Sequence, residues 1–127
     1  VQGYENKTPW EDVYLNGVVG DKGVYSTTED LLKFDRALEK NILISDSLKK
    51  LAFTKMNLER KGNKNYGYGF RIKEHEKYGK IVYHTGWWKG FRSYFVKVLD
   101  KNQTIIVLNN VKRGRFLNID KLIELIN

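Results

Sequence analysis

One stretch, residues 66–108, limits the fold more than any other part of the chain. It contains several runs with the composition and alternation of β-strands, and most of them are separated by short segments containing Gly, Asn or Asp. Strands joined by such short connections have to lie antiparallel, because a parallel pair needs a long crossover. The predicted strands cover residues 66–72, 80–85, 93–99 and 104–108, with turns at 77–79 and 100–102.

The last of these runs differs from the others. Residues 104–108 read TIIVL, without the polar alternation of a strand that has one solvated face. A continuous run of this kind is typical of a strand buried on both faces. We therefore predict that residues 104–108 form a central strand of the sheet.

A helix is predicted before the strand region. Ser26-Thr27-Thr28-Glu29 has the pattern of a capping box, in which a hydroxyl accepts a helical N–H and the glutamate reaches back. The apolar spacing that follows predicts a helix over residues 28–40, ending near Asn41. The residues expected on its inner face are Leu31, Leu32, Phe34, Ala37 and Leu38.

Two further helices have cap signals. One is expected from Ser45 or Asp46 to about Met56, and another follows Asn118 near the end of the chain. Their expected inner residues are Leu48, Leu51 and Ala52 in the former, and Ile119, Leu122, Ile123 and Ile126 in the latter.

The order of these elements indicates the fold class. Two helices, an antiparallel meander and a closing helix predict an α+β domain, with an antiparallel sheet of about three to five strands packed against helices. Residues 1–127 have the length of a single domain. Residues 1–22 and 59–65, rich in Gly and Asn or in charge, are expected to be loops, the first with a short strand.

Composition narrows the class of protein. The chain is 41% hydrophobic and 30% charged, as globular proteins are, and no apolar run approaches the roughly 18 residues of a membrane span. A net charge of +8 suits anionic partners, but lysines are spread along the chain, so a solvated surface is the simpler interpretation. With 0 Cys and no cluster of metal-ligating residues, neither a metal nor another cofactor is expected.

Several short motifs follow one another along the chain. They are Gly23-Val-Tyr-Ser-Thr-Thr-Glu-Asp-Leu-Leu-Lys-Phe34, Tyr68-Gly-Phe70, His84-Thr-Gly86 with Gly90-Phe91, and Leu108-Asn-Asn110. In this order the chain resembles the C-terminal part of the serine β-lactamase and penicillin-binding-protein superfamily, most closely its class C β-lactamase, D,D-peptidase and esterase branch. The resemblance implies a partial β-lactamase/transpeptidase-like fold, with residues 1–127 as the C-terminal fragment of a larger domain. It also suggests a periplasmic or extracellular location.

Enzymes of this superfamily use three motifs: Ser-x-x-Lys, with the nucleophile, then Tyr-x-Asn, then Lys-Thr-Gly or His-Thr-Gly. The chain contains literal matches to all three, at Tyr4–Asn6, Ser47–Lys50 and His84–Gly86. The first two stand in the wrong order, and the serine lies after the segment that begins at Gly23, where the superfamily has an ordinary surface helix. We therefore interpret only His84–Gly86 as a site motif and place the nucleophile outside this sequence.

The resemblance also assigns roles to the motif that remains. His84 gives electrostatic help near the nucleophile or a substrate carboxylate, and the hydroxyl of Thr85 donates to the substrate. Gly86 lets the substrate approach the backbone, and the N–H of Trp87 is one of two oxyanion-hole donors. The side chain of Trp88, like that of Trp87, is equally compatible with a substrate groove and with packing at the strand–turn corner.

These observations lead to two functional hypotheses. The first is a C-terminal piece of a serine acyl hydrolase, acting with an upstream part on a D-alanyl peptide, a β-lactam or an ester, and inactive alone. The alternative is a non-catalytic module that binds an anionic polymer, either cell-wall glycan or nucleic acid; nucleic acid is not an expected partner under the first hypothesis. Self-association through an exposed strand edge is expected for such a fragment.

Overall fold

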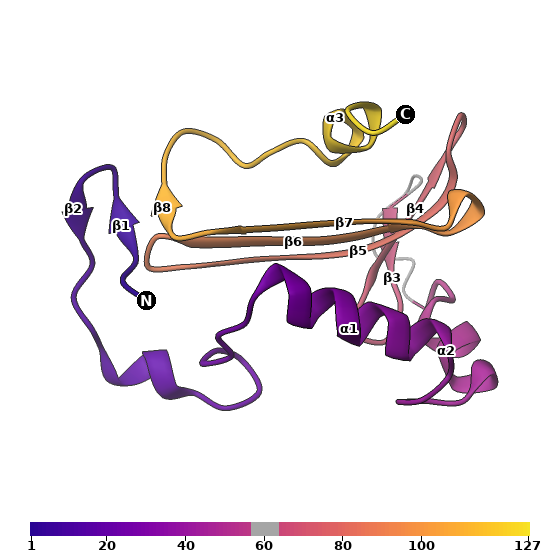
Figure 1. The fold of residues 1–127 in the computed structure, drawn as a ribbon, viewed down its shortest axis with the longest axis horizontal. Helices are drawn as coiled ribbons and strands as arrows, with labels where there is room; N and C mark the ends of the chain where they lie inside the picture. Colours follow the sequence, from indigo (N-terminus) through magenta and orange to yellow (C-terminus); the bar gives the residue numbers. More distant parts are fainter. Residues whose placement is uncertain (57–63) are drawn as a thin grey trace.

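The computed structural model describes residues 1–56 and 64–127, and its centre is a five-stranded antiparallel meander (Figure 1). The strand order follows the sequence, and every neighbouring pair is antiparallel. This confirms the predicted α+β class. The strands are β3 (Lys64–Tyr66), β4 (Arg71–His75), β5 (Gly79–Trp88), β6 (Phe91–Val98) and β7 (Gln103–Asn109).

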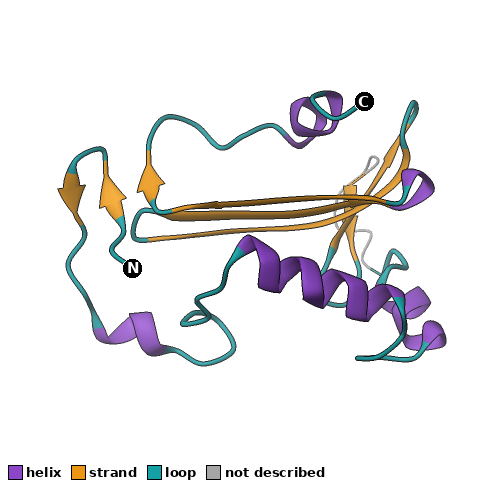
Figure 2. Ribbon diagram, in the orientation of Figure 1, coloured by secondary structure: helices purple, strands orange, loops and turns teal. Residues whose placement is uncertain are grey.

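The remaining elements flank this sheet, and Figure 2 shows how helices and strands are distributed. A small second sheet has the order β2-β1-β8, in which β1 runs parallel to β8 although they lie at opposite ends of the chain. The elements are β1 (Tyr4–Glu5), β2 (Thr8–Pro9), η1 (Tyr14–Gly17), α1 (Thr28–Glu39), α2 (Asp46–Ala52), η2 (Leu99–Lys101), β8 (Val111–Lys112) and α3 (Ile119–Glu124).

Helices cover both faces of the meander, α1 on one side and α3 on the other (Figure 1). On the α3 side, Leu122 and Ile123 join a buried cluster with Ile81 of β5 and Val96 of β6. On the α1 side, Phe34 contacts Phe95 of β6 edge to face, with ring centroids 6.0 Å apart. Burial of apolar side chains on both faces is the main source of stability for such a layered fold.

The prediction of a central strand at residues 104–108 is wrong. β7 is an edge strand, and within the described residues it pairs only with β6. Its faces are nevertheless both covered, since Ile105 and Val107 pack on the α3-side cluster while Thr104 meets α1. The apolar residues of this run therefore indicate that both faces of the strand are covered. They do not indicate whether the outer edge of the strand is hydrogen-bonded to another strand.

The predicted strand over residues 66–72 is two strands with a turn between them. β3 ends at Tyr66 and β4 begins at Arg71, so the alternating aromatic and glycine residues form the connection. Gly69 has φ +76°, and a Cβ on Gly67 would lie 2.0 Å from the carbonyl oxygen of Ala52. Glycine is required for both reasons. The loop expected at 59–65 falls largely outside the described residues, and its last positions belong to β3.

The site strand is longer than predicted because a tight hairpin was missed. β5 continues to Trp88 and β6 starts at Phe91, joined only by Lys89 and Gly90. Both connecting residues have positive φ, 43° and 91°, which is the pattern of a type I′ hairpin turn. Lysine in the first turn position hid this signal, since Asn or Asp is usual there.

The helix predictions are right in place and wrong in detail. The N-cap of α1 is Thr27, whose hydroxyl accepts from Asp30 N at 3.1 Å, and the helix begins at Thr28 as predicted. α2 ends at Ala52, short of the predicted limit near Met56. Leu48 and Leu51 of α2, expected inside, are 54% and 44% exposed. Leu32, Phe34 and Ile126, also expected to face inward, are partly exposed.

A buried ionic cluster joins α1 to the sheet. Lys97 of β6 and Asp35 of α1 form an ion pair, and they are only 5% and 2% exposed. Lys97 Nζ also lies 3.0 Å from Glu39 Oε1, and Thr104 Oγ1 donates to Asp35 Oδ2 at 2.8 Å. This cluster was not predicted, because the inner face of the helix was assigned from apolar residues alone.

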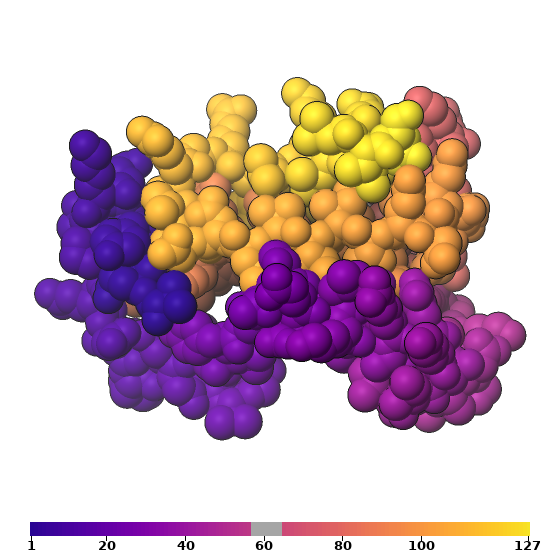
Figure 3. All heavy atoms as spheres, viewed as in Figure 1, coloured from indigo at the N-terminus to yellow at the C-terminus, as the bar shows by residue number. Residues whose placement is uncertain are grey.

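The N-terminal segment packs against the β5–β6 hairpin and fills one end of the molecule (Figure 3). Tyr4 N donates to Asn110 O at 2.8 Å, and a Cβ on Gly90 would lie 2.4 Å from Tyr4 N. The absence of a side chain at Gly90 therefore lets β1 cross the hairpin closely. This crossing brings residues near the start of the chain beside the end of the site strand.

Candidate functional site

The motif His84–Trp88 forms the second half of β5, where the strand has one free edge. β4 pairs with β5 only at residues 79–83, whereas β6 continues to pair with it as far as Trp88. Within the described residues, the outer edge of His84–Trp88 thus has no strand partner. Alternate backbone N–H and C=O groups on such an edge point outward and can bind an extended ligand.

The His84 ring is held by a side chain from another strand. Its Nε2 lies 2.9 Å from the hydroxyl of Tyr66, and the two rings meet edge to face at a centroid distance of 6.3 Å. Partial burial lowers the pKa of His84 below its usual value, and the nearby charge of Arg71 lowers it further. A neutral imidazole is therefore favoured at neutral pH.

Thr85 and Gly86 are half-buried in the middle of the free edge. Thr85 lies opposite Tyr94 and Gly86 opposite Ser93 of β6. A Cβ on Gly86 would lie 2.7 Å from Ser93 Oγ, so the serine hydroxyl would have to rotate away to admit a side chain here. Gly86 is thus packed closely against Ser93 of β6. A ligand on the other edge of β5 could approach its backbone as well.

The two tryptophans have different environments, which separates the alternatives that the sequence left open. Trp88 packs at the corner: its Nε1 donates to Asn16 Oδ1 at 2.7 Å, and Lys22 Nζ lies 4.4 Å from its ring. The side chain of Trp87 is 69% exposed beside the free edge. Trp88 is therefore anchored at the corner, whereas the ring of Trp87 is open to solvent beside the free edge.

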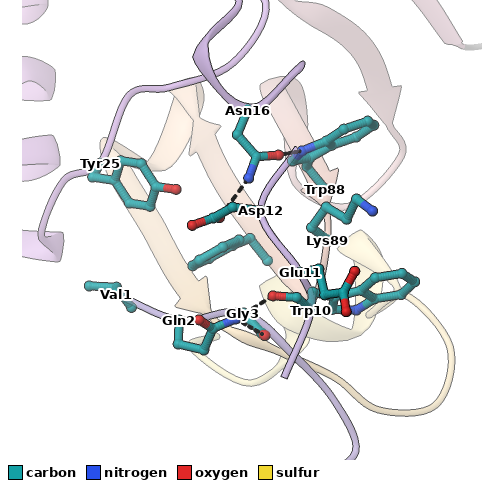
Figure 4. Close-up of a pocket in the computed structure, with 11 residues that line it drawn as sticks. Val1, Gln2, Gly3, Trp10, Glu11, Asp12, Asn16, Tyr25, Trp88 and Lys89 are labelled. Atoms are coloured by element: carbon teal, nitrogen blue, oxygen red, sulfur yellow. Dashed lines mark hydrogen bonds between the residues drawn. The ribbon is translucent and has the colours of Figure 1, made fainter. Parts of the chain in front are cut away.

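A cavity of about 260 Å³ lies next to this corner (Figure 4). Figure 4 shows Asn16 between Asp12 and Trp88, joined to both by hydrogen bonds, with the Tyr25 hydroxyl pointing toward the interior. The cavity is lined by Val1, Gln2, Gly3, Trp10, Glu11, Asp12, Asn16, Tyr25, Trp88, Lys89 and Phe91. The sequence did not predict it, because its walls come from segments brought together only by the β1 crossing.

The structure gives Ser47 and Lys50 no arrangement for catalysis. The Ser47 hydroxyl lies 2.9 Å from Ser45 Oγ, beside the N-cap of α2. Lys50 pairs with Asp46 at 2.7 Å, and this hydrogen bond and charge raise the pKa of Lys50. A lysine whose pKa is raised stays protonated and cannot accept a proton from serine.

Tyr4 and Asn6 also belong to a structural feature. Tyr4 lies in β1, and Asn6 adopts a left-handed conformation with φ 55° in the turn between β1 and β2. Glu5 between them pairs with Lys112 at 2.5 Å. These contacts hold β1 against β8. The Tyr4–Asn6 match to the motif therefore has a structural explanation that needs no catalytic role.

Residues 1–56 and 64–127 hold no group of three or more side chains placed to bind a metal ion. None of the helices described there is long and apolar enough to cross a membrane.

Comparison with known proteins shows which family the chain belongs to. Residues 2–125 match the family model described as Beta-lactamase. The chain is 37% identical over 98 residues to penicillin-binding protein 4* of Bacillus subtilis (strain 168), covering 77% of the chain and 22% of that protein. A penicillin-binding protein from Bacillus halodurans has a similar fold, with a TM-score of 0.62 and 23% identity over 69% of this chain and 27% of that structure. The chain spans about a quarter of the length of these relatives, and it belongs to the Beta-lactamase family.

Proposed function

We propose that this chain forms one wall of the active site of a serine acyl hydrolase of the β-lactamase, D,D-peptidase or esterase type. The observation that carries the proposal is the free edge of His84–Trp88, at the end of a strand whose other edge is fully paired. A rigid strand with an open edge can align an extended acyl substrate through backbone hydrogen bonds.

Each residue of the edge has a role in this proposal. The N–H of Trp87 stabilises the oxyanion that develops on the substrate carbonyl, and Thr85 donates its hydroxyl to the substrate. Gly86 keeps the strand close to both β6 and the ligand. His84 lies at the start of the edge, and its Nε2 is 2.9 Å from the hydroxyl of Tyr66, which holds the ring in place. An oxyanion donor of this kind contributes roughly 3 kcal/mol to catalysis.

The nucleophile belongs to a different part of the protein in this proposal. The chain spans only 22% of the length of the Bacillus subtilis relative, and Ser47 is bonded within a helix cap. Residues outside these 127 would supply the serine, its lysine and the tyrosine. The chain alone should therefore lack serine-hydrolase turnover.

The test is labelling by a fluorescent penicillin. The chain alone, and its Ser47→Ala variant, should not be labelled. A chimera in which this chain replaces the matching segment of the Bacillus subtilis relative should be labelled, because it restores the complete site. His84→Ala in the chimera should slow labelling about tenfold or more, which corresponds to losing roughly 1.5 kcal/mol of interaction.

Two controls test the role of His84 and the absence of a nucleophile in this chain separately. In the chimera, His75→Ala should label at the unmodified rate, since His75 contacts Tyr78 away from the edge. Covalent labelling of the chain alone that disappears in Ser47→Ala would contradict the proposed division of the site. So would a folded chimera in which His84→Ala labels as fast as His75→Ala.

No observation on residues 1–56 and 64–127 favours the alternative of an anionic-polymer module. Many of the lysines described there form ion pairs with carboxylates. The net charge of +8 does not show this pairing. The lysines in such pairs are Lys22, Lys33, Lys49, Lys50, Lys55, Lys73, Lys97 and Lys112.

A second expectation concerns the edge strand β7. Its outer edge has no strand partner among the described residues, and Leu108 near its end is 38% exposed. Unpaired edges of this kind pair with other chains. The isolated chain should therefore form dimers through β7 as its concentration rises, which light scattering would detect.

A lysine on the edge should suppress this association. Leu108→Lys places a charge beside the unpaired backbone and should shift the chain toward monomer. Leu125→Lys is the matched control, because Leu125 is 81% exposed near the end of the chain and lies after α3, outside β7. A strictly monomeric chain at high concentration, or equal effects of both substitutions, would count against pairing through β7.

A further inference from the structure

Three strands converge on the ring of His84. Tyr66 is the last residue of β3 and lies opposite Arg71, the first residue of β4. Arg71 in turn lies opposite Tyr83 of β5, the residue that precedes His84. The Tyr66 hydroxyl reaches Nε2 of His84 at 2.9 Å, so the end of β3 touches the beginning of the free edge.

Partial burial and the nearby charge of Arg71 disfavour the imidazolium form of this ring by lowering the pKa of His84. Arg71 Cζ lies 5.7 Å from the centre of the Tyr66 ring, and its charge adds to partial burial in lowering the pKa of His84. On β6 the residue opposite His84 is Phe95, which carries no charge. Among the contacts recorded for the described residues, Tyr66 from β3 and Arg71 from β4 are the titratable or charged groups that face the ring.

The 2.9 Å contact fits a hydrogen bond in either direction, but a phenol is the more acidic donor and a neutral imidazole nitrogen is the more basic acceptor, so donation from Tyr66 is favoured. A phenol hydroxyl donates to an imidazole nitrogen only if that nitrogen has its lone pair free. In a neutral ring with an unprotonated Nε2, the hydrogen is on Nδ1. We infer that Tyr66 is a positioning residue, which donates to Nε2 of His84 and holds it as the neutral Nδ1–H tautomer.

This inference deepens the proposed function and rests on it for its role in catalysis. A neutral imidazole presents an N–H donor to the substrate, whereas a lysine at the same position would present a fixed positive charge. A substrate group next to His84, such as an ester or amide carbonyl, would therefore meet a neutral ring and no fixed positive charge. A carboxylate at that place would find no cation in His84 at neutral pH.

The experiment is an NMR titration of the His84 imidazole in the isolated chain, with nitrogen shifts reporting the tautomer. The unmodified chain should show the Nδ1–H form and a pKa below that of an ordinary histidine. Tyr66→Phe should lose the Nδ1–H signature, because the donor to Nε2 is gone. Arg71→Gln should raise the pKa of His84 toward the ordinary value.

Matched controls exclude a general effect on the fold. Tyr68→Phe removes the hydroxyl of a tyrosine that is 59% exposed, two positions from Tyr66. Arg36→Gln removes an exposed arginine on α1. Both variants should leave the tautomer and the pKa of His84 unchanged, and the backbone spectra should match that of the unmodified chain.

Two outcomes would overturn the inference. One is an Nε2–H tautomer in the unmodified chain, and the other is a titration that Tyr66→Phe and Arg71→Gln leave unaltered. These measurements need neither substrate nor nucleophile, so they can fail while the chimera is labelled by penicillin. Conversely, the Nδ1–H form in a chain whose chimera is inert would refute the proposed function and leave the role of Tyr66 intact.

Discussion

Replacing Lys97 with methionine is expected to lower the free energy of unfolding by about 3–5 kcal/mol, as urea denaturation of the isolated chain would show. The substitution leaves the carboxylate of Asp35 buried, at 2% exposure, without its cation. Thr104 would still donate to Asp35, but one hydroxyl cannot replace a charge that has been removed from water. A large fraction of the stability of a domain of this size would be lost.

An exposed ion pair on α1 provides the control for the loss of the buried pair. Lys33→Met breaks an ion pair with Asp30 on the exposed side of α1, where water and salt screen the attraction, so its effect on the free energy of unfolding should be much smaller. The double variant Asp35→Leu and Lys97→Met removes both buried charges together and should recover much of the loss. If Lys97→Met costs no more than Lys33→Met, the cluster does not carry the stability assigned to it.

In the penicillin-labelled chimera, Trp87→Pro is expected to slow acylation by about 10²–10³. Proline removes the backbone N–H that the proposal assigns to the oxyanion, while Trp87→Ala keeps this N–H and removes only the exposed ring. The alanine variant should therefore lose much less activity than the proline variant. Single-turnover labelling rates of the two variants measure the difference directly.

Folding of the proline variant is itself informative. Proline is tolerated in a strand where the N–H faces away from the ladder. Trp87 lies opposite Arg92 of β6, so a Trp87 N–H engaged in that pairing would make Trp87→Pro unfold the hairpin. Loss of the fold, or equal rates for proline and alanine, would remove Trp87 from the oxyanion hole.

Periodicity and turn chemistry predicted the general order of this fold because those signals are local. The caps at Ser45 and Asn118 and the turn before Gly79 all lie where short-range hydrogen bonding or φ preferences place them. The position of β7 at the edge could not be predicted, since covered faces give the same residues in a central strand and an edge strand.

The candidate site was only partly visible for a similar reason. The motif His84–Gly86 is contiguous, so its order among other motifs was enough to single it out. Tyr66 lies 18 positions away from His84, and only the pairing of β3, β4 and β5 brings its hydroxyl to the imidazole. Asp35 was missed because a carboxylate on an inner helix face is recognisable only once its lysine is found on another element.

The parallel pairing of β1 with β8 has a consequence for the order of folding. Tyr4 lies opposite Val111, so this contact closes a loop that contains most of the chain. The entropy of closing so long a loop has to be offset by contacts that exist only after the β5–β6 hairpin has formed. The N-terminal strand is therefore expected to dock last on the pathway and to detach first during partial unfolding, which would open the corner that holds Trp88 while the meander stays intact.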